Sequence, residues 1–339
     1  MKKCVFSVVA VAMSLASWAY PRTYTADVST PEKAAAFAKR AWTGRDCDNV
    51  PLWPVGKVPL RIHDDHTELY TNEYRYANVI LTNVNDPFFR FYPAKGEDVK
   101  PCVVICPGGG YLRIGMNKEG TEVADWLNAI GFSAVVLAYR CGSQDQRDGA
   151  LCDAQRMIRL LRRDAKKYNV DPNRIGIIGF SAGANLAIRA STNWKRPMYG
   201  KVDDADAFSC RPDFQLPIYP WDVRVRVKVA DDGWPQTWGN EYDQSIYPVA
   251  GDTPPAFIVQ TLDDFCQPET ATVYDFVLRR AGVDSTLKLY QTGGHGYGLR
   301  QRGNPCDLWP YEATAWLARF ANPLPGAEVL GERNCPLSR

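Results

Sequence analysis

From about residue 100 onward, short runs of apolar residues alternate with segments in which apolar positions recur every three or four residues. Short runs rich in valine and isoleucine are typical of strands buried on both faces, and the longer segments are typical of helices that pack on a sheet. This alternation predicts an α/β fold, a three-layer sandwich in which helices cover both faces of a mostly parallel central sheet. The predicted strands are residues 103–105, 134–137, 175–178, 214–219, 256–260 and 286–290.

Each predicted helix carries one apolar stripe. In residues 151–168 the apolar side chains at positions 151, 154, 158, 161 and 165 fall on one face, while the arginines and lysines face water. Residues 119–130 and 268–282 show the same spacing, and a shorter helix is predicted over residues 184–190.

The N-terminus has the pattern of a signal peptide. Lys2 and Lys3 precede an apolar run over residues 5–15, and Ser17 and Ala19 form a small-x-small cleavage site. The run is much shorter than the ~20 residues that cross a bilayer. We therefore predict that residues 1–19 are removed and that the protein is secreted or periplasmic.

The remaining chain divides into three predicted parts. Residues 20–75 are rich in proline, charge and aromatic side chains, with one helical stretch near 31–42, and are interpreted as an N-terminal extension that wraps the core. Residues 76–322 form the α/β domain, and 323–339 a C-terminal tail. Within the domain, residues 220–253 separate two strands and carry valines at alternate positions, which predicts a hairpin that could serve as a lid or substrate wall.

Charge and cysteine content exclude several classes of partner. Signal removal takes away two of the 40 basic residues and none of the 38 acidic ones, so the formal net charge becomes zero, which does not favour nucleic acid or an anionic membrane. The remaining cysteines are odd in number and form no CxxC pair or zinc spacing, so no metal site is predicted. Cys102 and Cys106 are predicted to be buried thiols, and disulfides among the others stay open.

The clearest chemical motif is Gly179-Phe180-Ser181-Ala182-Gly183, which lies between a predicted strand and a predicted helix. A nucleophile elbow needs small residues on both sides because its turn is tight, and this tightness lifts the serine hydroxyl clear of the backbone. The pattern alone is weak. Its position between strand and helix makes Ser181 the candidate nucleophile.

A serine hydroxyl needs a base to take its proton, and such folds order the triad as serine, acid, histidine. His295 is the only histidine after Ser181. His63 and His66 lie upstream and are interpreted as part of a solvated turn rather than a metal site. The acid is expected after the strand at 256–260, where Asp263 and Asp264 compete, with Asp222 a more distant alternative.

Acyl transfer also requires N–H donors for the oxyanion. The candidates are Ala182, directly after the serine, and Gly109 and Gly110 of the glycine run that follows the first core strand. Glycines let the backbone approach a substrate more closely than residues with a Cβ atom.

Seven motifs in order resemble the acetylxylan-esterase-like carbohydrate esterases, over about residues 50–322. The motifs are Pro51-Leu52-Trp53-Pro54, Cys106-Pro107-Gly108-Gly109-Gly110-Tyr111, Tyr139-Arg140, Asp153-Ala154-Gln155-Arg156, Gly179-Phe180-Ser181-Ala182-Gly183, Arg211-Pro212-Asp213-Phe214 and Gly294-His295-Gly296-Tyr297-Gly298-Leu299. Members of this family are α/β-hydrolases that remove O-acetyl groups from plant polysaccharides and oligosaccharides.

The resemblance implies Ser181 as nucleophile, His295 as base, and Gly109, Gly110 and Ala182 as oxyanion donors. It also implies Asp263 as the acid, with Asp264 the near alternative, because the family's acid precedes a helix start like Pro268-Glu269-Thr270 at a fixed distance. An acetylated carbohydrate is the implied substrate, and no cofactor is needed. The chain departs from the family at Ala184 and Asn185, where a second glycine and a histidine are common, and in the long, tryptophan-rich segment 220–253.

Four aromatic residues are candidates to stack on sugar rings, although core or lid packing would explain each equally well. They are Tyr111, Trp221, Trp234 and Trp238. The alternatives to an acetyl esterase are a feruloyl-type esterase, a prolyl-oligopeptidase-like peptidase, whose propeller the extension is too short to build, and a carbohydrate-binding protein without turnover.

Overall fold

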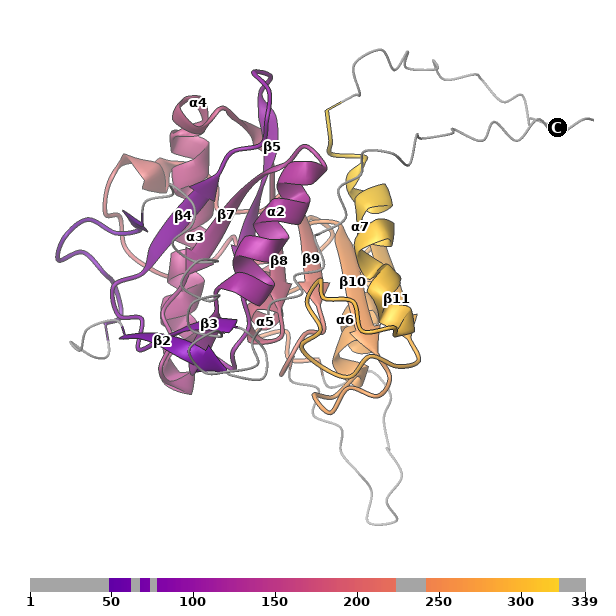
Figure 1. Ribbon diagram of the computed structural model, residues 1–339. Coiled ribbons are helices and arrows are strands. Elements are labelled where there is room, and N and C mark those ends of the chain that lie inside the picture. The colour runs from indigo at the N-terminus through magenta and orange to yellow at the C-terminus, as the bar shows by residue number, and fades with distance from the viewer. Residues whose placement is uncertain (1–48, 62–67, 74–77, 224–241, 323–339) are drawn as a thin grey trace, which may run out of the picture.

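The computed structural model describes residues 49–61, 68–73, 78–223 and 242–322. A sheet of eight strands runs through the described residues in the order β1-β4-β7-β5-β8-β9-β10-β11 (Figure 1). The strands β7, β5, β8, β9, β10 and β11 are parallel to one another, and β4 pairs antiparallel with β7 and with β1. Their bounds are β1 Val50–Pro51, β4 Phe88–Tyr92, β5 Lys100–Cys106, β7 Ser133–Ala138, β8 Val170–Phe180, β9 Phe214–Ile218, β10 Ala256–Thr261 and β11 Ser285–Tyr290.

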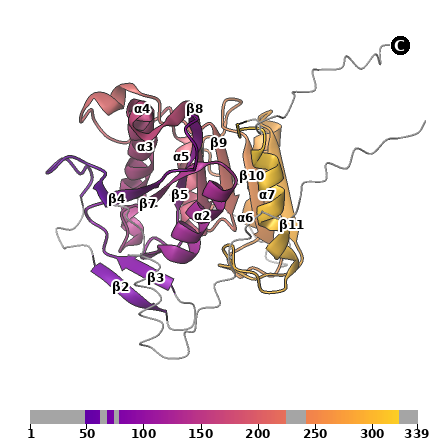
Figure 2. The same ribbon diagram turned by 45° about the horizontal axis from the view of Figure 1, so that its top comes forward.

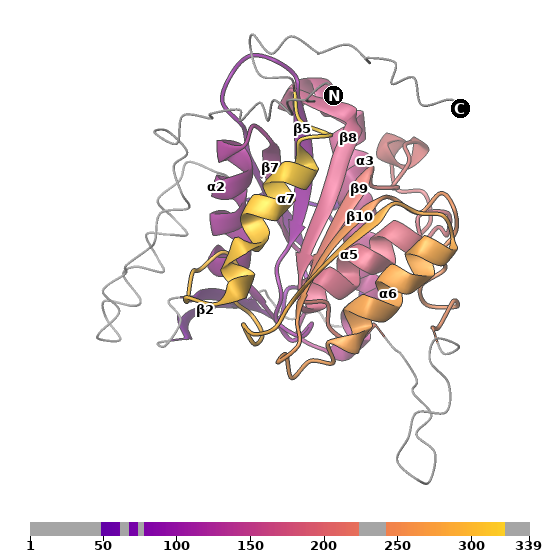
Figure 3. The same ribbon diagram turned by 90° about the vertical axis from the view of Figure 1, so that its right-hand side faces the viewer.

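The predicted α/β class and all of the predicted strands are confirmed. Every residue of β5 and β7 is buried, because helices cover the sheet on both faces. Figure 3 shows α2 and α7 on one face and α3, α5 and α6 on the other. The helices are α2 Glu122–Ala129, α3 Arg147–Arg163, α4 Ala165–Tyr168, α5 Ala182–Thr192, α6 Glu269–Arg280 and α7 Trp309–Leu317.

The predicted helix over 151–168 begins one turn earlier than expected and is interrupted at Asp164, which separates α3 from α4. A π-helical turn, Asn117–Thr121, leads directly into α2. Between α2 and α7, which lie on the same face of the sheet, the rings of Trp126 and Trp309 pack edge to face with centroids 5.4 Å apart.

A second, antiparallel sheet of three strands lies at one end of the main sheet (Figure 2). It consists of β2 Glu68–Glu73, β3 Asn78–Thr82 and β6 Arg113–Gly115. The described part of the predicted extension thus contributes β1 to the edge of the main sheet and β2 to the small sheet, and neither strand was expected from the sequence.

Several sequence predictions lie outside the described residues. They include the signal peptide 1–19, the helical stretch near 31–42, the turn with His63 and His66, the tail 323–339 and the hairpin, since residues 224–241 are not described. The cysteines that are described have free thiols, and Cys102 and Cys106 are buried as predicted. Within the described ranges, no helix has both the length and the apolar character needed to cross a bilayer.

Candidate active site

The carboxyl ends of parallel strands share one edge of the sheet, which is where sites form in this class of fold. Ser181 occupies the turn between β8 and α5 with φ +54° and ψ −117°, a conformation that costs energy for a residue with a Cβ atom. Both glycines of the motif are required sterically. A Cβ atom on Gly179 would lie 2.0 Å from the Gly183 carbonyl oxygen, and one on Gly183 would lie 1.9 Å from that of Cys106.

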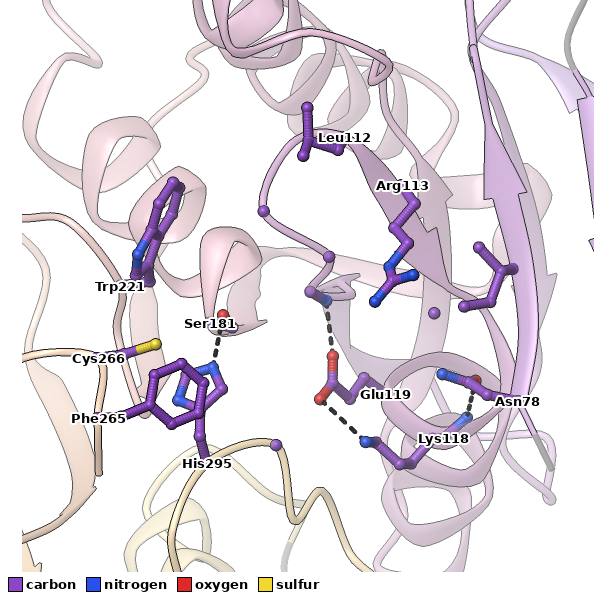
Figure 4. Close-up of a pocket in the computed structure, with 16 residues that line it drawn as sticks. Asn78, Leu112, Arg113, Lys118, Glu119, Ser181, Trp221, Phe265, Cys266 and His295 are labelled. Carbon is purple, nitrogen blue, oxygen red and sulfur yellow. Dashed lines mark hydrogen bonds and ion pairs between the residues drawn. The ribbon is translucent and has the colours of Figure 1, made fainter. Parts of the chain in front are cut away.

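His295, in the loop after β11, connects the serine to a carboxylate. Its Nε2 lies 2.8 Å from Ser181 Oγ, and its Nδ1 lies 2.8 Å from Asp264 Oδ2 (Figure 4 shows the first contact). A carboxylate can only accept a hydrogen bond, so Nδ1 carries the proton and Nε2 presents its lone pair to the hydroxyl. This is the arrangement in which histidine can act as a general base.

The prediction that Asp263 is the acid is wrong, because Asp264 makes the contact with His295. The Asp264 side chain is fully buried, and its second oxygen accepts from the Cys266 amide at 2.7 Å. Asp263 points to the exposed side of the turn and accepts from the amides of Gly294 at 2.8 Å and Gly293 at 3.2 Å.

The Gly294 amide holds the pKa of Asp263 below its ordinary value. Asp263 therefore supports the loop that carries the histidine instead of contacting the imidazole. The more distant alternative, Asp222, forms an ion pair with Arg147 at 2.6 Å.

The predicted oxyanion donors lie beside the serine. Gly109 and Gly110 line the same pocket as Ser181 and have φ values of +145° and +66°. A Cβ atom on Gly109 would lie 2.0 Å from the Arg113 carbonyl oxygen, so the turn admits no larger residue. Ala182 is the first residue of α5, and its N–H is one of the amides that find no partner within a helix.

The pocket in front of Ser181 has a volume of about 440 Å³ and two chemically different walls (Figure 4). Trp221, Phe265 and Cys266 lie on the side of His295, and Phe265 is 83% exposed. The opposite wall comes from the small sheet and the π-helical turn. It contains Asn78, Ile80, Arg113, Gly115, Lys118 and Glu119.

The four aromatic residues that were candidates to stack on sugar rings lie in different places. Trp221 lines the pocket, and the Arg147 guanidinium lies 5.1 Å from its ring centre. Tyr111 is fully buried and donates to Asn185 Oδ1 at 2.9 Å, which fits core packing, one of the two roles that the sequence had left open. Trp234 and Trp238 lie outside the described residues.

Asn185, where the family often has histidine, instead holds the loop after β9. Its Nδ2 donates to the Asp222 carbonyl at 2.8 Å and to the Tyr247 hydroxyl at 2.9 Å. No sequence signal had distinguished Phe265, Glu119 or Tyr219, which the fold brings to the site.

Cys266 lies beside the acid and the base. Its Sγ, a carboxylate oxygen of Asp264 and a ring nitrogen of His295 all lie within 4.8 Å of one another. Burial raises the pKa of the Cys266 thiol to about 11. The thiol is therefore protonated near neutral pH and is a weak nucleophile there. Ser181, with its adjacent base, is the stronger candidate.

Known proteins resemble this chain in both sequence and fold. The BD-FAE family model matches residues 90–216. An acetylxylan esterase of Xylanibacter ruminicola is 32% identical over 210 residues, which are 58% of this chain and 41% of that protein. Endo-1,4-beta-xylanase B of Butyrivibrio fibrisolvens is 29% identical over 59% of this chain and 33% of its own length. The chain thus spans less than half the length of these two curated relatives.

A solved structure matches over nearly its whole length. It is the acetyl ester-xyloside bifunctional hydrolase from Caldicellulosiruptor lactoaceticus, with 30% identity and a TM-score of 0.65, and the match covers 81% of this chain and 97% of that one. Because this likeness reaches 30% identity and covers most of both chains, the chain belongs to the acetylxylan-esterase-like carbohydrate esterases of the α/β-hydrolase superfamily.

Proposed function

We propose that the protein is a serine esterase that removes O-acetyl groups from plant polysaccharides or oligosaccharides. The observation that carries this proposal is the hydrogen-bond chain from Ser181 Oγ through His295 to Asp264, with both distances at 2.8 Å. A histidine held in this tautomer activates a serine hydroxyl without any cofactor.

In the proposed reaction, His295 Nε2 takes the hydroxyl proton as Ser181 Oγ attacks the ester carbonyl carbon. The amides of Gly109, Gly110 and Ala182 stabilise the negative charge that develops on the carbonyl oxygen. The imidazolium then protonates the departing sugar oxygen, which leaves an acetyl group on Ser181. Water, deprotonated by His295, attacks this acyl-enzyme and releases acetate.

The proposed substrate class rests on the comparisons and on the pocket. Two similar proteins are named for acetylxylan esterase and acetyl ester-xyloside hydrolase activity. Trp221 and the exposed ring of Phe265 give one wall the aromatic character that favours sugar rings. Both features support an acetylated xylan or xylo-oligosaccharide as substrate.

The test is acetate release from acetylated xylan and from 4-nitrophenyl acetate, by the wild type and by Ser181→Ala. We expect the wild type to act on both and the mutant on neither. Cleavage of the small ester alone would refute the polysaccharide assignment and leave the serine mechanism. Cleavage of neither by a folded protein would favour a binding protein, and preferential cleavage of methyl ferulate would favour the feruloyl-type alternative.

We also propose that the protein is secreted or periplasmic, based on the signal-peptide pattern of residues 1–19. N-terminal sequencing of the mature protein is expected to begin near Tyr20. Recovery of an intact Met1 from the exported fraction would contradict removal of this segment.

A further inference from the structure

Glu119 is a buried acidic residue beside the active site that the proposed reaction does not use. It lies in the π-helical turn Asn117–Thr121 and is 6% exposed. Its two carboxylate oxygens accept hydrogen bonds from two different loops. Oε2 accepts from the Gly108 amide at 2.8 Å, and Oε1 accepts from the Tyr219 hydroxyl at 2.8 Å.

The first of these contacts fixes the loop of oxyanion glycines. Gly108 is so enclosed that a Cβ atom on it would lie 2.7 Å from Glu119 Oε2, 2.7 Å from the Phe180 carbonyl oxygen and 3.0 Å from Ser181 Cβ. The start of the loop is thus held between Glu119 and the nucleophile elbow (Figure 4 labels Glu119 and marks its hydrogen bond to this loop with a dashed line). The positions of Gly109 and Gly110, which follow directly, therefore depend on how Gly108 is held.

The second contact reaches the loop that carries the histidine. Tyr219, fully buried directly after β9, accepts a hydrogen bond from the Gly298 amide at 3.0 Å while donating to Glu119. The rings of Tyr219 and His295 pack edge to face, with centroids 5.0 Å apart. A Cβ atom on Gly298 would lie 3.2 Å from the Lys118 carbonyl oxygen, so the histidine loop also passes close to the π-helical turn.

The charge of Glu119 does not itself favour the reaction. A carboxylate near the oxyanion donors opposes the negative charge that develops there. A buried carboxylate is also costly unless it is well paired, and here two donors and Lys118 Nζ, 4.0 Å from Oε1, compensate it. The contribution of Glu119 is therefore geometric.

We propose that Glu119 is a positioning residue that joins the oxyanion loop to the histidine loop, so that the amide donors and the base keep their places relative to Ser181. This inference rests on the proposed esterase function for its kinetic consequence. Its structural consequence is independent of that function, because the same carboxylate protects the Gly108 and Gly298 amides, the latter through Tyr219.

The matched variants are Glu119→Gln and Glu122→Gln. Glu122 lies one turn further along, is also 6% exposed, and pairs with Arg300 at 2.6 Å without contacting either loop glycine. Glutamine keeps the size of Glu119 but has one acceptor oxygen, so its amide group faces one of the two donors.

The kinetic measurement uses 4-nitrophenyl acetate. We expect Glu119→Gln to lower kcat by about 10-fold or more and Glu119→Ala by on the order of 100-fold, with KM changed less than about threefold, because the loss falls on the transition state. Glu122→Gln is expected to keep kcat within about threefold. Equal kcat losses in Glu119→Gln and Glu122→Gln would overturn the proposal, because Glu119 would then only support folding.

Hydrogen–deuterium exchange tests the same proposal without relying on activity. Peptides that cover residues 106–116 and 293–299 are expected to exchange faster together in Glu119→Gln. In Tyr219→Phe only the second peptide should exchange faster, whereas Tyr274→Phe, which removes a buried hydroxyl elsewhere, should change neither. Wild-type exchange of both peptides in Glu119→Gln overturns the proposal. If the wild type shows no esterase activity but both peptides still exchange faster in Glu119→Gln, only the proposed esterase function is overturned.

Discussion

At the scale of single residues, the site shows how two adjacent carboxylates take different roles. Asp264 is buried and contacts the imidazole, while Asp263 is exposed and contacts the backbone of the histidine loop. Neighbouring side chains in a turn point in different directions, so one carboxylate can orient the base while the other orders the loop. The two positions should therefore respond differently to the same substitution.

We predict that Asp264→Asn lowers kcat by about 10³- to 10⁴-fold, because an asparagine amide donates to Nδ1 and shifts the ring proton to Nε2, where it faces the serine. Asp263→Asn should lower kcat by less than about 10-fold, since the asparagine oxygen still accepts from one loop amide. Steady-state hydrolysis of 4-nitrophenyl acetate measures both, and thermal melting checks that both variants fold. A loss in Asp263→Asn as large as that in Asp264→Asn would contradict this division of roles.

Ser181 could be predicted because its tight turn requires the flanking glycines, and His295 could be predicted because it is the only histidine after that serine. It could not choose between Asp263 and Asp264, since both follow the same strand and the choice depends on side-chain direction within a turn. The role of Tyr111 stayed open for a related reason. Its ring follows the glycine run, yet it turns inward to Asn185, and no sequence pattern records that direction.

At the scale of elements, the junction of β8 and α5 is the most constrained part of the fold. The serine conformation, the close approach of Gly183 to the end of β5 and the packing of α5 on the sheet all depend on one turn. A Cβ atom added at Gly179 or Gly183 would meet backbone atoms first. No side chain could therefore move aside to make room for a larger residue.

We predict that Gly179→Ala lowers the free energy of unfolding by at least about 1–3 kcal/mol, because its methyl group would lie 2.0 Å from the Gly183 carbonyl oxygen. Gly200→Ala is the control, since a Cβ atom there meets nothing within 4 Å, and its effect should stay within ~0.5 kcal/mol. Urea unfolding followed by tryptophan fluorescence measures both. A Gly179→Ala protein as stable as the control would mean that the turn can rearrange.

The burial and the length of each strand explain which strands could be predicted from the sequence. Five of the six confirmed strands lie inside the sheet, where burial on both faces requires continuous apolar runs. The sixth, β11, is the edge strand beside β10 and is only partly buried. Among the missed strands, β1 lies at the opposite edge and β4 lies next to it, and the others form the small sheet. β1 has two residues, β6 has three, and an arginine interrupts β4. Such short or mixed segments carry no period, so pairing with distant strands decides their structure.

At the scale of the whole molecule, a buried ion pair links the N-terminal segment to the α/β core. The Asp153 carboxylate accepts from Trp53 Nε1 at 2.7 Å, from the Arg140 backbone amide at 3.0 Å, and from two nitrogens of the Arg140 guanidinium at 2.8 and 2.9 Å. The side chains of Arg140 and Asp153 are 1% and 0% exposed. One carboxylate thus joins the segment after β1, the end of β7 and α3.

We predict that Asp153→Asn lowers the free energy of unfolding by about 3–5 kcal/mol, because it leaves the Arg140 charge buried without a counter-charge and turns an amide N–H group toward other donors. The control is Asp171→Asn, which removes a partly exposed pair with Arg174 and should cost less than about 1 kcal/mol. Urea unfolding compares the two, and limited proteolysis reports on the segment around Trp53, which should be cut sooner in Asp153→Asn. Equal stability losses in the two variants would show that the Arg140 charge finds another partner or water, and the buried pair would then not be what holds the N-terminal segment to the core.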